Sequence, residues 1–263
     1  MRYCLIGLWL VCRMALAQPD PFPQVAAAYQ VEINGVLLWQ HAPTRRLPPA
    51  SLTKLMTALL VLDGYDPQVQ VTISHAAARE SGTRLGVRAG ERYALEDLLT
   101  AALLASDNDA CHALADHMAG DEAHFVQRMN RRARELGMHD TRFANACGHD
   151  QTDHYSTAHD LALLAHAAMS NAVVRAIVAQ SEAYIATPRV PAQRLENKNA
   201  LIGRYPGALG VKSGYTPRAG KCLIAYARRN GSEVLLVLLN APKRWWDAAD
   251  ILDLAFAHGT ATP

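Results

Sequence analysis

The sequence has 263 residues, of which 50% are hydrophobic and 19% are charged. Such a chain can bury a full core, and its composition excludes a disordered protein. Its formal net charge is +2 and, once Arg2 and Arg13 are set aside, 24 basic residues face 24 acidic ones, which argues against a nucleic-acid partner or a polybasic membrane role.

The first 17 residues have the pattern of a secretory signal peptide. A short positive start at residues 1–2 precedes an apolar run at residues 4–12, and the small residues Ala15-Leu16-Ala17 provide a cleavage site. We therefore expect residues 1–17 to be removed and residues 18–263 to be periplasmic, with no stable membrane anchor. A non-cleaved anchor and a misassigned start are the alternatives. The apolar run is too short to span a bilayer comfortably.

Three cysteines remain after that cleavage: Cys111, Cys147 and Cys222. They show neither a CxxC pattern nor zinc-ligand spacing. One disulfide at most can form, and burial as small apolar residues is the simpler interpretation. We expect neither a metal nor a cofactor.

A β-hairpin is predicted near the start of the mature chain. Residues 26–33 and 36–39 are rich in strand-forming types and flank Asn34-Gly35, the pair best suited to a type I′ turn. A polar loop then leads to Ser51, where a helix is expected because apolar residues recur at helical spacing: Leu52, Leu55, Met56, Leu59 and Leu62.

The middle of the chain is predicted to be mostly helical and its end to return to strands. Residues 69–73 fit a short strand, and helical patterns follow at 95–104, 110–118, 121–136 and 157–169. A strand is expected near 209–211, a second hairpin around Asn230-Gly231 with strands at 222–227 and 233–239, and a last helix at 245–256.

These elements predict an α+β fold. One antiparallel sheet of about five strands, built from both chain ends and flanked by helices, buries both hairpins economically, and a helical lobe is inserted between them. We expect residues 18–263 to form a single catalytic unit. Its α/β part covers 26–60 and 205–257, and its mostly helical lobe covers about 75–180.

Three short motifs carry the candidate chemistry. Ser51 and Lys54 stand at i and i+3, so that an amine can accept the proton of a neighbouring hydroxyl as it attacks a carbonyl. Ser106-Asp107-Asn108 and Lys212-Ser213-Gly214 follow in that order. Each alone fits an ordinary feature, namely a solvated surface, a helix cap or a strand end. Their order and their contexts favour a catalytic site.

The ordered set resembles the active-site serine penicillin-recognising enzymes, with S-x-x-K, S-x-N and K-[ST]-G. The stretches at 49–57, 95–99 and 210–216 are similar to those of the low-molecular-mass D-Ala-D-Ala carboxypeptidases, and the similarity runs from about residue 26 to residue 256. This resemblance implies a β-lactamase/transpeptidase-like fold and a serine carboxypeptidase. Its substrates would be peptidoglycan stem peptides, and β-lactam antibiotics would inhibit it.

The resemblance also implies roles for the matching residues. Ser51 would form the acyl-enzyme, Lys54 would be its general base, and Ser106 would relay a proton to the leaving D-alanine. Four further side chains would hold the substrate: Asn108 on its amide, and Lys212, Ser213 and, as a further candidate, Arg244 on its carboxylate. Gly214 would lie beside Tyr215, whose backbone N–H would complete an oxyanion hole with that of Ser51.

Two departures from the family pattern stand out. Asp107 replaces the usual glycine, as in many class A β-lactamases, and Ser213 replaces the common threonine. We expect no C-terminal β-rich domain and no anchor helix, since the chain stops soon after the catalytic unit should close.

Several alternatives remain open. A class A β-lactamase needs a loop glutamate in an E-x-x-x-N context, which none of the candidates has: Glu122, Glu135, Glu182 and Glu196. A DD-endopeptidase would use the same site. A non-catalytic peptidoglycan-binding module predicts a broken motif set. A zinc hydrolase is suggested only by the histidines at 149, 154 and 159, which lack HExxH spacing and are interpreted as polar surface.

Overall fold

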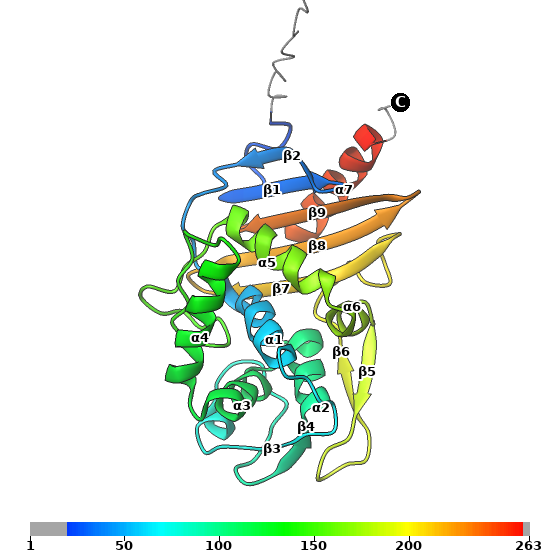
Figure 1. Cartoon of the computed structure of the whole chain (residues 1–263). Coiled ribbons are helices and arrows are strands. Elements are labelled where there is room, and N and C mark those ends of the chain that lie inside the picture. The colour runs from blue at the N-terminus through cyan, green and yellow to red at the C-terminus, as the bar shows by residue number, and fades with distance from the viewer. Residues whose placement is uncertain (1–19, 260–263) are drawn as a thin grey trace, which may run out of the picture.

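The computed structural model describes residues 20–259, so the predicted signal peptide lies outside the described residues. Five antiparallel strands form the central sheet in the order β2-β1-β9-β8-β7, and a lobe of helices lies against it (Figure 1). The α+β fold with a five-stranded sheet built from both chain ends is therefore confirmed. The sheet strands are β1 (Ala28–Ile33), β2 (Val36–His41), β7 (Ala208–Thr216), β8 (Gly220–Arg229) and β9 (Ser232–Leu239).

Both predicted hairpins form around Asn-Gly turns. Asn34 and Gly35 have φ of 51° and 76°, and Asn230 and Gly231 have φ of 49° and 82°. Two consecutive left-handed residues define the type I′ turn, which matches the twist of the flanking strands. Pairing of β1 with β9 then joins the two ends of the chain in one sheet.

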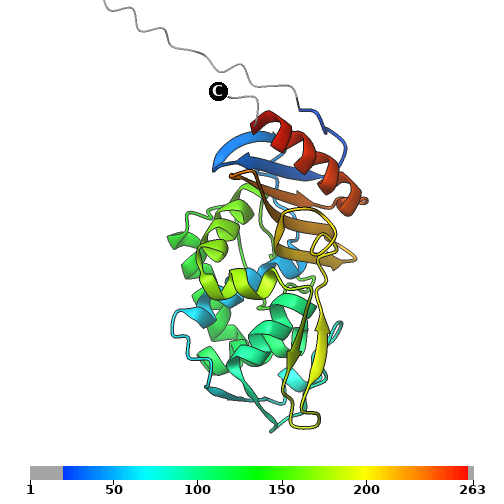
Figure 2. The same cartoon turned by 90° about the vertical axis from the view of Figure 1, so that its right-hand side faces the viewer.

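The sheet is buried on both faces because its strands alternate between two apolar cores. In β9, Val234, Leu236 and Leu238 pack with α7 (Arg244–Gly259), while Leu235, Val237 and Leu239 face the helical lobe. Figure 2 shows α7 on one side of the sheet and the lobe on the other. Burial of each leucine side chain stabilises the fold by about 1.5–3 kcal/mol. A charged substitution on either face of β9 would therefore weaken the packing of α7 or of the lobe on the sheet.

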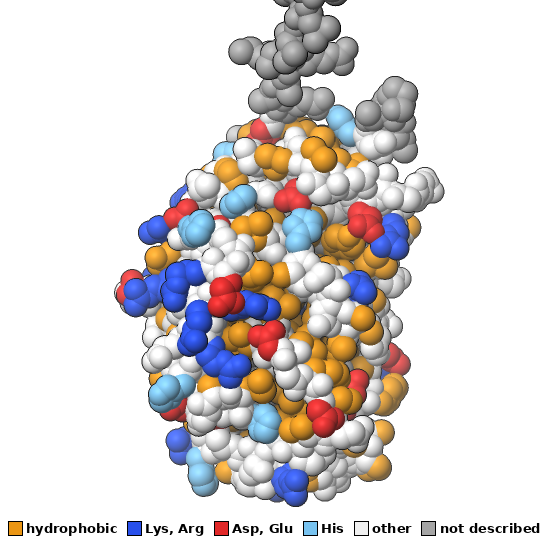
Figure 3. All heavy atoms as spheres, in the orientation of Figure 1, with side chains coloured by type: hydrophobic (Ala, Val, Ile, Leu, Met, Phe, Trp, Pro, Cys, Tyr) orange, Lys and Arg blue, Asp and Glu red, His pale blue; other side chains and the backbone are white. Residues whose placement is uncertain are grey.

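The lobe surrounds α1 (Lys54–Leu62), which is almost entirely buried. The other helices are α2 (Leu95–Thr100), α3 (Asn108–Ala119), α4 (Glu122–Glu135), α5 (Ala158–Ser170) and α6 (Ala172–Val178). Helix α4 is amphipathic: its apolar residues Phe125, Met129 and Ala133 recur every fourth position and are buried. Basic side chains gather over the region of α4 on the face seen in Figure 3, and the helix itself carries four arginines: Arg128, Arg131, Arg132 and Arg134.

Some local structure differs from the prediction. Ser51 lies in a 3-10 turn, η1 (Ala50–Thr53), and the α-helix begins only at Lys54. The helix expected at 95–104 is α2 followed by a π-helical turn, η3 (Ala101–Ala105), and a 3-10 turn, η2 (Ala77–Arg79), lies before it. The strand expected at 69–73 is β3 (Gln70–Thr72), and three short strands were not predicted: β4 (Arg92–Ala94), β5 (Glu182–Ile185) and β6 (Gln193–Glu196).

Within residues 20–259, no single helix is both long and apolar enough to cross a membrane. Helices α5 and α6 would pass that test of length and composition only as a pair, and they meet at a bend of 100°.

Candidate active site

The three motifs converge on one groove of about 250 Å³ between the β7 edge of the sheet and the lobe. Its lining includes six of the nine predicted site residues: Ser51, Ser106, Ser213, Gly214, Tyr215 and Arg244. Lys54 and Lys212 are buried, and Asn108 is hydrogen-bonded to Lys54. Thr83 and Lys198 also line the groove, although the sequence analysis did not single them out.

Two glycines permit close packing of other backbone segments against the turn that carries Ser51. Ala50 has a left-handed φ of 51°. A Cβ at Gly148 would lie 2.0 Å from the carbonyl oxygen of Ala50, and a Cβ at Gly214 would lie 2.9 Å from the backbone nitrogen of Ser51. Gly214 of the third motif therefore permits β7 to lie directly against the serine turn.

Lys54 is buried and makes three polar contacts. Its Nζ lies 3.0 Å from Ser51 Oγ, 2.7 Å from Asn108 Oδ1 and 2.8 Å from the backbone oxygen of Cys147. The amide and carbonyl oxygens can only accept hydrogen bonds. A neutral amine would donate its two N–H groups to them, and its lone pair would then face the hydroxyl of Ser51.

The second motif is positioned by the end of the π-helical turn and the start of α3. Ser106 adopts a left-handed conformation with φ 66° and ends the turn. Asn108 donates its Nδ2–H to the backbone oxygen of Ser81 at 2.6 Å. The carboxylate of Asp109 accepts backbone N–H groups from three successive residues at 2.7–3.2 Å: Leu85, Gly86 and Val87. A loop from the other side of the lobe is thereby tied to the start of α3.

Asp107 is buried next to this motif. Burial, together with the nearby carboxylate of Asp109, raises the pKa of Asp107 to about 7, although the charges of three lysines act in the opposite direction: Lys54, Lys198 and Lys212. The residue that departs from the family pattern thus brings a buried acid close to the site.

The third motif lies on β7. Burial and the positive charge of Lys54 hold the pKa of Lys212 well below its usual value. Lys212 donates from Nζ to the backbone oxygen of Ser213 at 3.1 Å, and Ser213 Oγ donates to the backbone oxygen of Lys198 at 3.1 Å. The segment carrying Lys198 is held in turn by its N–H bond to Leu104, at 3.0 Å.

Arg244 reaches the groove from the first residue of α7. Its Nη1 donates to the backbone oxygens of Gly214 and Cys222, and its guanidinium stacks on Trp245 at 4.4 Å. Burial lowers the pKa of Arg244. Its Nε finds no hydrogen-bond acceptor among the described residues, so the side chain has capacity for an anionic ligand.

A set of charged groups that do not line the groove was not predicted from the sequence. His112 Nδ1 lies 2.5 Å from Glu80 Oε1, and His149 Nε2 lies 2.9 Å from Glu80 Oε2. Burial opposes the charges, but the contacts with the two histidines lower the pKa of Glu80, and Asp116 and Glu80 raise the pKa of His112 to about 10. Glu80 thereby connects the segment before Ser81 to the segment after Gly148.

The interpretation of the histidines at 149, 154 and 159 as polar surface is wrong for His154. It is buried, its Nδ1 accepts the N–H of Ala144 at 3.0 Å, and its Nε2 lies 2.9 Å from Thr53 Oγ1. Burial lowers its pKa to about 4, so it is neutral at pH 7. Asp150 accepts hydrogen bonds from Thr216 and Arg218 at the end of β7. No group of three or more His, Cys, Asp and Glu in residues 20–259 is arranged to hold a metal ion.

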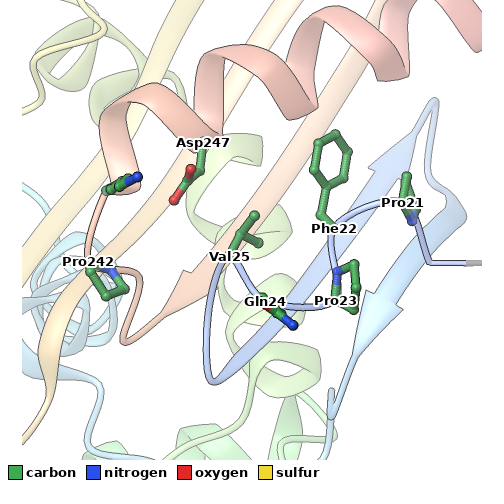
Figure 4. Close-up of a pocket in the computed structure, with 8 residues that line it drawn as sticks. Pro21, Phe22, Pro23, Gln24, Val25, Pro242 and Asp247 are labelled. Atoms are coloured by element: carbon green, nitrogen blue, oxygen red, sulfur yellow. The ribbon is translucent and has the colours of Figure 1, made fainter.

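A separate hollow of about 470 Å³ lies between the segment before β1 and the start of α7. Figure 4 shows Phe22 and Val25 facing Asp247 and Pro242 across it. None of the three motifs contributes to its lining, so the candidate chemistry belongs to the smaller groove.

Comparison with known proteins agrees with this geometry. Residues 17–243 match the family described as Peptidase_S11, D-alanyl-D-alanine carboxypeptidase. The chain belongs to this D-alanyl-D-alanine carboxypeptidase family. The family resemblance and the class of serine peptidase predicted from the sequence are thereby confirmed. This is a family of bacterial cell-wall enzymes that typically act outside the cytoplasm, with peptidoglycan as substrate and penicillin as ligand.

Several known proteins are similar to this chain over most of its length. The D-alanyl-D-alanine carboxypeptidase DacF of Bacillus subtilis is 34% identical over 88% of this chain, which spans 61% of DacF. A D-alanyl-D-alanine endopeptidase of Escherichia coli is 32% identical over 91% of this chain and 79% of its own length. The crystal structure of the Streptomyces K15 DD-transpeptidase superimposes with a TM-score of 0.84, at 30% identity, covering 90% of this chain and 99% of that one.

Proposed function

We propose that this protein is a serine D-Ala-D-Ala carboxypeptidase that removes the terminal D-alanine of peptidoglycan stem pentapeptides through an acyl-enzyme on Ser51. The observation that carries the proposal is the position of Lys54. Its Nζ lies 3.0 Å from Ser51 Oγ and has two further partners that can only accept. This arrangement suits a neutral amine that takes the proton of the serine hydroxyl.

Acylation would begin with attack of Ser51 Oγ on the carbonyl of the penultimate D-alanine, while Lys54 takes the proton. The oxygen of that carbonyl becomes negative, and the backbone N–H groups of Ser51 and Tyr215 would stabilise it. The close approach of Gly214 to the backbone nitrogen of Ser51 supports this role, because Tyr215 is the next residue of β7.

The terminal carboxylate of the substrate would bind Lys212, Ser213 and Arg244. A carboxylate beside Lys212 would favour the protonated form of that lysine, which burial disfavours in the free protein. The Nε–H of Arg244, which has no hydrogen-bond acceptor among the described residues, supports a role of this side chain in carboxylate binding.

Release of D-alanine requires a proton on its amine, and Ser106 would relay it from Lys54. Asn108 would hold the substrate amide while it orders Lys54. Water entering the place of the free D-alanine would then hydrolyse the ester, with Lys54 or Ser106 assisting. No step needs a metal or a cofactor.

The β-lactamase alternative lacks, among the described residues, a loop glutamate placed to act as the deacylating base. Glu122 accepts the N–H of Ala146, Glu135 pairs with Arg132, and none of the candidate glutamates lines the groove. Glu182 and Glu196 both pair with Arg194 on the β5–β6 hairpin. A penicilloyl ester on Ser51 should therefore persist.

DD-endopeptidase action is a second candidate, because two of the similar proteins have that name. We further propose that residues 18–263 act as one catalytic unit in the periplasm after removal of residues 1–17, with its α/β part at 26–60 and 205–257. Export suits a substrate in the cell wall.

The proposal is tested by turnover on two substrates in one preparation. We expect steady release of D-alanine from a pentapeptide, together with a burst of nearly stoichiometric penicillin consumption. Sustained penicillin hydrolysis without D-alanine release would contradict the proposal. Cleavage of a crosslinked dimer faster than the pentapeptide would favour the endopeptidase.

A further inference from the structure

Two of the three cysteines lie against each other behind the catalytic lysine. Cys111 is on α3, one turn after Asn108, and Cys147 lies in the loop that follows Ala146. Cys111 Sγ is 3.3 Å from the backbone oxygen of Ala146, and Cys147 Sγ is 3.5 Å from the backbone oxygen of Asn108. Each sulfur therefore contacts the segment that carries the other.

The two segments have a shared task at the active site. Asn108 and Cys147 provide the side-chain and backbone oxygens that hold Lys54 Nζ at 2.7 and 2.8 Å. Any covalent link between Cys111 and Cys147 would therefore brace both partners of Lys54 from behind the groove.

Cys222 is placed differently. Its sulfur contacts the backbone oxygens of Pro48, Ala219 and Gly220 near the turn between β7 and β8. Cys111 and Cys147 thus form a pair among the described residues, and Cys222 remains single.

We propose that Cys111 and Cys147 form an intramolecular disulfide when the chain folds in an oxidising environment, and that the structure, in which all three thiols are free, corresponds to the reduced form. The bond would stabilise the protein by closing a loop between positions 36 apart in the sequence. Formation of the bond does not require that Ser51 carry out the proposed reaction.

The oxidation requires a disulfide oxidant, such as oxidised glutathione or a thiol–disulfide oxidoreductase. One protein thiolate attacks the oxidant and forms a mixed disulfide, and one sulfur of the oxidant leaves as a thiol. The second protein thiol loses its proton and attacks the mixed disulfide, so that the S–S bond forms and the other oxidant sulfur leaves. Two protein thiols are oxidised, and one oxidant disulfide is reduced to two thiols.

The timing of the oxidation follows from the surroundings of the two thiols. Burial opposes ionisation, but the contact with Cys147 and the nearby charge of Lys54 lower the pKa of Cys111, whereas burial and the contact with Cys111 raise the pKa of Cys147. Both sulfurs are inaccessible in the folded protein, so the bond forms during folding and is then protected from reductants.

The test folds the full chain in a buffer of oxidised and reduced glutathione, unfolds it in denaturant at neutral pH with an excess of an alkylating reagent, and maps the peptides. We expect a linked peptide pair containing Cys111 and Cys147, and alkylation of Cys222. Prior reduction should leave all five cysteines of the chain alkylated and lower Tm by about 5–10 °C.

Single-cysteine variants provide the controls. Cys222→Ser should keep the linked pair, and Cys111→Ser should lose it without another pair replacing it. Full alkylation of Cys111 and Cys147 in the glutathione-folded wild type, or an unchanged Tm after reduction, would overturn the proposal. Labelling of Ser51 by penicillin is measured separately on the same samples, so failure of the disulfide and failure of the proposed reaction are distinguishable.

Discussion

Adding a single methyl group at Gly214 should abolish most acylation while leaving the fold in place. The new Cβ would lie 2.9 Å from both Ala50 Cβ and the Ser51 backbone nitrogen, well inside the 3.5–4.0 Å at which carbon atoms pack. The strand or the serine turn must therefore move by roughly 0.5–1 Å, a displacement that costs about 100-fold in rate at a reacting centre. Loss of one oxyanion donor costs about 100- to 1000-fold. We expect Gly214→Ala to lower the second-order rate of acylation by a fluorescent penicillin by about 100- to 1000-fold.

The matched control is Gly64→Ala. A Cβ at Gly64 has no atom within 4 Å, so the rate should equal that of the wild type. Overpacking at Gly214 should reduce stability by only about 1–3 kcal/mol, and the thermal unfolding of the variant should remain cooperative. If folded Gly214→Ala is acylated within threefold of the wild-type rate, the argument that β7 and the serine turn form one oxyanion site is wrong.

Three further predictions concern charge. The pKa of Asp107 is raised to about 7, so between about pH 4 and 7 the native state holds a proton that the unfolded state has lost. The free energy of unfolding should therefore fall by up to about 4 kcal/mol as pH rises through that window. Urea unfolding of Asp107→Asn should lack this fall, and a pH profile equal to that of the wild type would refute the prediction. The pKa of His112 is raised to about 10, so the stability that its charged form contributes is complete below about pH 6.5 and is lost as pH rises through 10. Glu80→Gln should lower the free energy of unfolding by about 3 kcal/mol at pH 7 and show a smaller further decline up to pH 10. Equal declines in variant and wild type would count against the pairing of Glu80 with His112. Arg244→Leu should reduce D-alanine release from a free-acid pentapeptide at least tenfold more than cleavage of its C-terminal amide; equal losses would exclude Arg244 from the carboxylate subsite.

Local signals in the sequence were sufficient to predict the central sheet and to locate the three motifs. The Asn34-Gly35 and Asn230-Gly231 pairs predict both hairpins because few other residues tolerate two consecutive left-handed conformations. The helix beginning near Ser51 was predicted from apolar spacing, although its first turn is a 3-10 turn. The spacing of Ser51 and Lys54 predicted their contact, because i and i+3 share a helical face.

Contacts between distant segments could not be predicted in the same way. A backbone oxygen such as that of Cys147 leaves no residue signature, although it is one of three partners of Lys54. Glu80 meets His112 and His149 from positions 32 and 69 residues away, and only the folded chain brings them together. The sequence likewise left three possible pairings of Cys111, Cys147 and Cys222, and only the fold shows that Cys222 lies apart from the other two.

The central claim is that Ser51 is the sole nucleophile, and covalent labelling tests it most directly. The protein is incubated with a penicillin, its intact mass is measured, and the modified peptide is mapped, with Ser51→Ala treated in parallel. The account predicts one penicilloyl group per chain, located on Ser51, and no adduct on the folded variant. An adduct that persists undiminished in Ser51→Ala would contradict it.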